Sequence, residues 1–156
     1  MLSKEKKSLR CLSQEGGPFH DFAISLPCKT KDNLLFYKAM KRAHEALLHE
    51  YLSYFPCVAL VGPRQCGKTT LLGVLPQDWQ IYDIERSSDH EVIARDPDQF
   101  LRLNPTAVAI DEVQLLPSLF PALRVAIDQQ RDQRGHNVIT GSSSPALVRS
   151  IAELLN

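Results

Sequence analysis

Several features that would assign this 156-residue chain to a common class are missing from its sequence. No apolar run approaches the roughly 20 residues that a membrane-spanning helix needs. The basic N-terminus is not followed by the apolar segment of a secretory signal. The formal net charge is zero, so no overall field attracts nucleic acid or an anionic membrane. We therefore expect neither a membrane nor a nucleic acid as a partner.

The cysteines lack any spacing signature. The four cysteines are Cys11, Cys28, Cys57 and Cys66, and no two of them form a C-x-x-C pair. Neither a disulfide framework nor a zinc site is indicated. Free thiols are typical of a reducing compartment, so the sequence predicts a cytoplasmic protein.

The remaining composition is that of one globular domain. Hydrophobic residues make up 44% of the chain and charged residues 23%, which is ordinary for a chain with its own core. Residues 1–35 show no sustained periodicity, and we expect a flexible N-terminal arm there. From Phe36 onward, apolar residues recur at three- and four-residue steps, which predicts an amphipathic helix. The predicted domain is 36–156.

Beyond that helix, short apolar runs alternate with helical patterns. The expected strands are 57–61, 80–84, 107–110 and 137–140. Helices are expected after each, including one opened by a capping box at Ser88, one capped by Asp96, one from Ser118 to Arg134, and a last one capped by Ser144. Such alternation predicts an α/β fold with a parallel sheet and helices on both faces.

The most informative stretch follows the first of these strands. It fits G-x-x-x-x-G-K-[ST], the phosphate-binding loop. In this motif two glycines let the backbone point N–H groups at phosphate oxygens, the lysine reaches the β- and γ-phosphates, and the hydroxyl ligates Mg²⁺. The candidate nucleotide-binding residues are Gly62, Pro63, Arg64, Gln65, Cys66, Gly67, Lys68, Thr69 and Thr70.

Two acids stand directly after the third expected strand. Asp111 and Glu112 follow the apolar run 107–110, at the sheet edge where ligands of parallel α/β proteins bind. Asp111 is placed to hold Mg²⁺ beside Thr69. Glu112 is placed to orient and deprotonate an attacking water, which makes Glu112 and Lys68 the candidate catalytic residues.

Polar residues also follow the fourth expected strand. Either Thr140 or Ser142 could hydrogen-bond the γ-phosphate or the attacking water and so report the nucleotide state. Ser142 is our candidate for a further nucleotide contact. Asp83 ends the second strand on the same edge, where a ligand contact and a plain turn acid are both consistent with the pattern.

Together these motifs resemble a known family. The run 61–71 resembles the G-P-R-Q-x-G-K-T-T-L signature of a group of AAA-like ATPases of bacteria and archaea. The later matching segments follow in order: Asp96-Pro97 with Phe100, 109–114 with Pro117, Leu123 to Asp128, and 140–143. The resemblance covers about residues 42–156.

The resemblance implies a P-loop NTPase three-layer sandwich of the additional-strand, catalytic-glutamate type, with MgATP as ligand. It also implies Lys68, Thr69, Asp111 and Glu112 as its site. Cys66 departs from the family, where an aliphatic residue is usual. Because a thiol inside the loop lies near the positive helix end, we expect it to react with maleimide and to be protected by MgATP. Family members also continue beyond 151–153, so the chain resembles a member that is incomplete at its C-terminus.

Three functions fit these observations. The first is hydrolysis of the β–γ bond of MgATP. The second is an ATP-binding module or truncated remnant with little turnover, because a fifth strand and any later arginine are not found in the sequence. In that case an exposed sheet edge would favour self-association. A protein partner would supply the arginine. The third is a P-loop small-molecule kinase, which usually has an arginine-rich lid. Between 114 and 142 the arginines are Arg124, Arg131 and Arg134, all on one expected helix.

Overall fold

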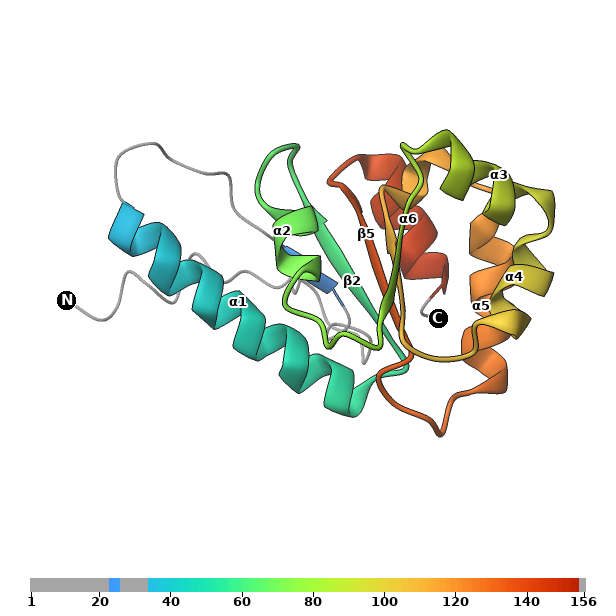
Figure 1. Ribbon diagram of the computed structural model, residues 1–156, viewed down its shortest axis with the longest axis horizontal. Coiled ribbons are helices and arrows are strands. Elements are labelled where there is room, and N and C mark those ends of the chain that lie inside the picture. The colour runs from blue at the N-terminus through green and yellow to red at the C-terminus, as the bar shows by residue number, and fades with distance from the viewer. Residues whose placement is uncertain (1–22, 26–33, 155–156) are drawn as a thin grey trace.

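The fold is built on one five-stranded parallel sheet. The computed structural model describes residues 23–25 and 34–154, with side chains from residue 43 onward. The strand order is β1-β2-β5-β4-β3 (Figure 1). The strands are β1 (Ala23–Ser25), β2 (Cys57–Gly62), β3 (Gln80–Asp83), β4 (Val108–Asp111) and β5 (Asn137–Ser142).

The last strand of the chain lies in the middle of the sheet. β5 pairs with β2 from Cys57↔Asn137 to Gly62↔Ser142, and with β4 from Val108↔Asn137 to Ile110↔Ile139. It therefore separates β2, which leads into the loop after Gly62, from β4, which ends in Asp111. This inserted strand is the arrangement expected of the additional-strand class. Because all pairings are parallel, the carboxyl ends of β2, β5, β4 and β3 share one edge of the sheet.

Helices cover both faces of the sheet, which confirms the three-layer prediction. α1 (Leu34–Tyr54) and α2 (Lys68–Leu72) cover one face. The other is covered by α3 (Ser87–Arg95), α4 (Pro97–Leu103), α5 (Leu119–Gln129) and α6 (Pro145–Leu154). β2 serves both layers, because Val58 and Leu60 pack toward α1 and α2 whereas Ala59 and Val61 pack toward α5 and α6. Such continuous burial is typical of a central parallel strand.

α1 is an amphipathic helix that covers one face of the sheet. Leu48 and Leu52 are buried against the sheet, while His49, Glu50 and Ser53 are exposed. This spacing matches one face of a helix. In the part of the chain that the structure describes, no helix is both long and apolar enough to cross a bilayer.

One short part of the predicted N-terminal arm is a strand in the structure, and it covers part of a sheet edge that the sequence analysis left open. Ala23–Ser25, inside the segment 1–35, forms β1 and pairs in parallel with β2 at Ala59, Leu60 and Val61. The rest of the predicted arm, 1–22 and 26–33, lies outside the described residues. A three-residue strand is too short to show a period of two, so only pairing with a preformed neighbour reveals it. β1 covers this edge of β2 at residues 59–61, and self-association stays a prediction.

The helix ends agree with the sequence at two caps and differ from it at two other positions. Asp96 caps α4 as expected, because its carboxylate accepts a hydrogen bond from Gln99 N at 2.9 Å, and Ser144 Oγ accepts from Leu147 N at 3.2 Å at the start of α6. The capping box at Ser88 is wrong, since α3 already begins at Ser87 after an extended Arg86. α5 ends at Gln129 instead of Arg134, because the polar run 130–134 offers no side chain to bury.

Candidate functional site

The residues between β2 and α2 form the turn that the motif predicts. Gly67 has φ 104° and ψ 20°, a left-handed conformation that a side chain would strain. Gln65 is also left-handed, with φ 62°. Two such residues in one short segment curl the backbone tightly, as a phosphate cradle requires. β2, the turn and α2 therefore reproduce the predicted strand, loop and helix.

Lys68 is the buried charge at the centre of this loop. The residue is 4% exposed. Its Nζ donates hydrogen bonds to Gly62 O and Pro63 O, both at 3.1 Å. The ammonium also lies 3.8 Å from Glu112 Oε1. Because a buried cation needs partners, the loop carbonyls and Glu112 hold Lys68 where phosphate oxygens could replace them.

Asp111 links the loop to two other strand ends. Its carboxylate is buried at the end of β4 and accepts a hydrogen bond from Thr69 Oγ1 at 2.5 Å. The Thr140 hydroxyl of β5 donates to the other carboxylate oxygen. Thr69 and Asp111 thus bring a hydroxyl and a carboxylate together, and oxygen is the ligand atom that Mg²⁺ prefers. The described residues hold no group of three or more His, Cys, Asp or Glu suited to a metal, so a Mg²⁺ ion held by Thr69 and Asp111 would need phosphate oxygens and water as its other ligands.

Glu112 adopts an uncommon backbone conformation that directs its side chain. Its φ of 57° and ψ of 44° place it in the left-handed region, which is costly for a non-glycine residue and is concentrated at functional sites. Its N–H donates to Asp111 Oδ1 at 3.1 Å and to Thr140 Oγ1 at 3.3 Å. The side chain is 14% exposed and faces Lys68. The turn therefore points Glu112 toward the loop, where water could still reach it.

The two sensor candidates differ in their surroundings. Thr140 is buried, and its hydroxyl is engaged by Asp111 and by Glu112 N–H, so it orients the acids. Ser142 is only half-buried, and its N–H donates to Gln114 Oε1 at 3.3 Å. Of the two residues, Ser142 stays the candidate for a nucleotide contact.

A family model described as an AAA domain matches residues 54–156, more than half of the chain and all of the residues above. The chain belongs to the AAA domain family. Two uncharacterized proteins, from Mycobacterium bovis and Mycobacterium tuberculosis, are each 38% identical to it over 117 residues. The match covers 74% of this chain and 26% of each mycobacterial protein, so the chain spans about a quarter of their length. No solved structure matches this AAA domain.

Other predicted residues of the AAA domain lie around this centre. Arg64 and Gln65 are exposed on the loop, and Arg64 Nη2 lies 3.4 Å from Glu85 Oε1. Asp83 closes β3 with local contacts, because its carboxylate accepts from Glu85 N at 3.0 Å and pairs with Arg86. These contacts favour the interpretation of Asp83 as a turn acid.

Cys66 is placed differently from the sequence-based expectation. The residue is 6% exposed, and it belongs to the core cluster that includes Leu48 and Leu71. The loop backbone turns tightly at Gln65 and Gly67, and the Cys66 side chain lies beneath it in the core. The thiol is therefore part of the packing under the loop. Neither Cys66 nor Cys57 forms a disulfide.

Gln114 is the site residue that the sequence reasoning did not assign. It lies in the short 3-10 helix η2 (Val113–Leu115) and donates from Nε2 to Glu112 Oε2. A glutamine two residues after the acids has no spacing signal of its own. The signal that could have found it is the family resemblance, because the matching run 109–114 ends at Gln114.

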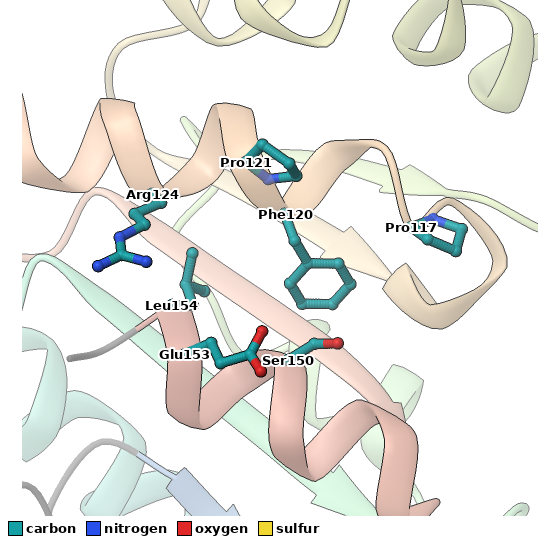
Figure 2. A pocket seen from close by; sticks show the side chains of 7 residues that line it. All are labelled: Pro117, Phe120, Pro121, Arg124, Ser150, Glu153 and Leu154. Atoms are coloured by element: carbon teal, nitrogen blue, oxygen red, sulfur yellow. The ribbon is translucent and has the colours of Figure 1, made fainter.

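A pocket of about 340 Å³ lies apart from these residues, between α5 and α6. Figure 2 shows Phe120 and Arg124 of α5 above Ser150 and Glu153 of α6. It is lined by neither the phosphate loop nor the two acids. The candidate site is recognised by the chemistry of its side chains and not by this pocket.

The two described cysteines should react very differently from the same residues in the unfolded chain. Burial raises the pKa of the Cys57 thiol to about 12, so it stays protonated and unreactive up to at least about pH 9. We expect N-ethylmaleimide at pH 7.5 to leave Cys57 unlabelled and to modify Cys66 slowly, with MgATP slowing it further. Peptide mass spectrometry after timed labelling measures both, with guanidinium-unfolded protein as control. Labelling of Cys66 as fast in the folded as in the unfolded chain would contradict its placement.

Proposed function

We propose that the chain binds MgATP in the loop 62–70 and hydrolyses its β–γ bond. The observation that carries the proposal is the meeting of Lys68, Thr69, Asp111 and Glu112 at one sheet edge. Thr69 and Asp111 are joined by a hydrogen bond of 2.5 Å, and Lys68 and Glu112 lie 3.8 Å apart. AAA domain membership supports a nucleotide as ligand.

In the proposed complex, the backbone N–H groups of the loop surround the phosphates, together with the Thr70 N–H at the start of α2. Lys68 exchanges the carbonyl oxygens of Gly62 and Pro63 for oxygens of the β- and γ-phosphates. The exchange is favourable because a phosphate carries full negative charge, whereas a carbonyl oxygen carries a partial one.

Thr69 and Asp111 are the residues that would hold Mg²⁺. When bound, the ion neutralises charge on the β- and γ-phosphate oxygens. Thr140 orients Asp111, because its hydroxyl donates a hydrogen bond that keeps the Asp111 carboxylate turned toward Thr69.

The proposed chemistry uses Glu112 as the base. Its carboxylate takes a proton from a water molecule as the water oxygen bonds to the γ-phosphorus. The bond from the γ-phosphorus to the β–γ bridging oxygen breaks, and that oxygen leaves with ADP. Ser142 is placed on the neighbouring strand end to contact the γ-phosphate or that water.

We infer slow turnover for the chain by itself. Lys68 is the cation that contacts Glu112 among the described side chains, and Arg149 is exposed on α6. An arginine contributed by a protein partner could raise the rate on the order of 10³–10⁵-fold. A small-molecule kinase is less well supported, because Arg131 pairs with Asp128 and Arg124 lines the separate pocket. A cytoplasmic location is part of the proposal, and it is supported by Cys57 and Cys66, which are not joined in a disulfide.

The binding claim predicts a large effect of Lys68→Ala. Loss of a charged hydrogen-bond donor to phosphate costs about 1.5–3 kcal/mol, so the Kd for MgATP should rise roughly 10- to 100-fold. Isothermal titration calorimetry measures this directly. Arg102→Ala is the control, because it removes an exposed cation on α4 that pairs with Asp98. Equal affinity in wild type and Lys68→Ala would refute the proposed binding mode.

The hydrolysis claim predicts that Glu112→Gln separates binding from chemistry. An amide cannot accept the proton, so turnover should fall about 10²–10⁴-fold while MgATP binding persists. Phosphate release under single-turnover conditions gives the rate, and calorimetry gives the affinity. Glu91→Gln, which changes an exposed carboxylate of α3, should behave as wild type. If Glu112→Gln turns over at the wild-type rate, Glu112 is not the base.

A further inference from the structure

Gln114 uses both ends of its amide within the candidate site. Its Nε2 donates a hydrogen bond to Glu112 Oε2. Its Oε1 accepts a hydrogen bond from Ser142 N at 3.3 Å. The side chain is half-buried in η2 and bridges the acid after β4 to the end of β5. A glutamine is suited to this bridge because its amide carries a donor and an acceptor side by side.

The backbone beneath this amide leaves room for it. Gly141 precedes Ser142, and a Cβ at this position would lie 2.5 Å from Gln114 Oε1 and would also collide with Leu147 of α6. A side chain here would therefore displace the amide from its place over β5. The absence of a Cβ and the length of the glutamine together allow the contact.

The Glu112 carboxylate has two side-chain contacts, and in the proposed complex one of them weakens while the other remains. One carboxylate oxygen faces Lys68 at 3.8 Å, and the other accepts from Gln114. In the proposed complex Lys68 turns to the phosphates, which weakens the first contact. The Gln114 contact does not involve Lys68, and it remains to hold the carboxylate.

The bridge also connects Glu112 to the phosphate loop by a second route. Ser143 N donates to Gly62 O at 3.3 Å, and the same carbonyl oxygen accepts from Lys68 Nζ. A movement of Gly62 on phosphate binding is therefore passed to 142–143 and, through the amide of Gln114, to Glu112. These contacts form a closed ring of Lys68, Gly62, the 142–143 backbone, Gln114 and Glu112.

We propose that Gln114 is the positioning residue of this site: it aims the Glu112 carboxylate and ties that carboxylate to the β5–α6 turn that meets the γ-phosphate. The proposal rests on the proposed function, in which Glu112 is the base. Gln114 itself transfers no proton. Its contribution is to hold the carboxylate of Glu112 in the orientation from which water can be deprotonated.

The direct test compares Gln114→Ala with wild type. The kcat for MgATP hydrolysis should fall about tenfold or more, while the Kd for MgATP should stay within about twofold because no phosphate contact is removed. Gln114→Glu should lose as much, since it places a carboxylate against Glu112 Oε2. Leu115→Ala is the matched control, because this η2 neighbour is exposed.

A structural role is distinguished from a positioning role by the double variant. In Glu112→Gln, the base is already absent, so adding Gln114→Ala should not lower the residual rate further. If Gln114→Ala instead caused a general loss of packing, it would lower the hydrolysis rate by the same factor in the wild-type chain and in Glu112→Gln. Thermal denaturation of each variant checks that all of them fold.

A measurement without nucleotide tests the bridge itself. The side-chain amide signal of Gln114, assigned by its loss in Gln114→Ala, should shift in the NMR spectrum of Glu112→Gln. An unchanged signal, or a Gln114→Ala kcat within twofold of wild type, would overturn the inference while leaving the proposed function intact. Absence of hydrolysis by the wild-type chain would overturn the proposed function and the inference with it.

Discussion

The arrangement of the site depends on one buried ammonium group. Lys68 Nζ is shared between two loop carbonyl oxygens and the Glu112 carboxylate. An unpaired charge at this depth would be strongly destabilising, so each partner must be supplied by the fold. Two come from the end of β2 and the residue after it, and one from the turn after β4. The loop and the acids are thereby held in register before any nucleotide arrives.

The sheet order explains how these partners meet. β5 lies between β2 and β4, and its end supplies Thr140, which holds Asp111, and Ser142, whose N–H holds Gln114. The central strand therefore aligns residues from both neighbours without carrying a charged group there. Asp111 and Glu112 point to different partners because the left-handed turn at Glu112 breaks the strand between them. One acid faces Thr69 and the other faces Lys68.

Local patterns in the sequence predict the elements and the chemistry of this site, but not how its parts meet. The phosphate loop follows from glycine and lysine spacing, and the acids follow from an apolar run that ends in two carboxylates. The central place of β5 depends on pairing between residues about 80 apart, which periodicity does not report. The inward side chain of Cys66 and the Gln114 bridge depend on the curl of the loop and on a glycine in another strand. The sequence does not predict β1 either, because this three-residue strand is defined by its pairing with β2.

The most direct test of this account is a crystal structure of the chain with Mg²⁺ and a non-hydrolysable ATP analogue. The account predicts the triphosphate in the loop 62–70, with Lys68 Nζ moved from Gly62 O and Pro63 O to phosphate oxygens. It also predicts Glu112 still bonded to Gln114 and facing the γ-phosphate. A nucleotide bound elsewhere, for example between α5 and α6, with Lys68 still on the loop carbonyls, would contradict it.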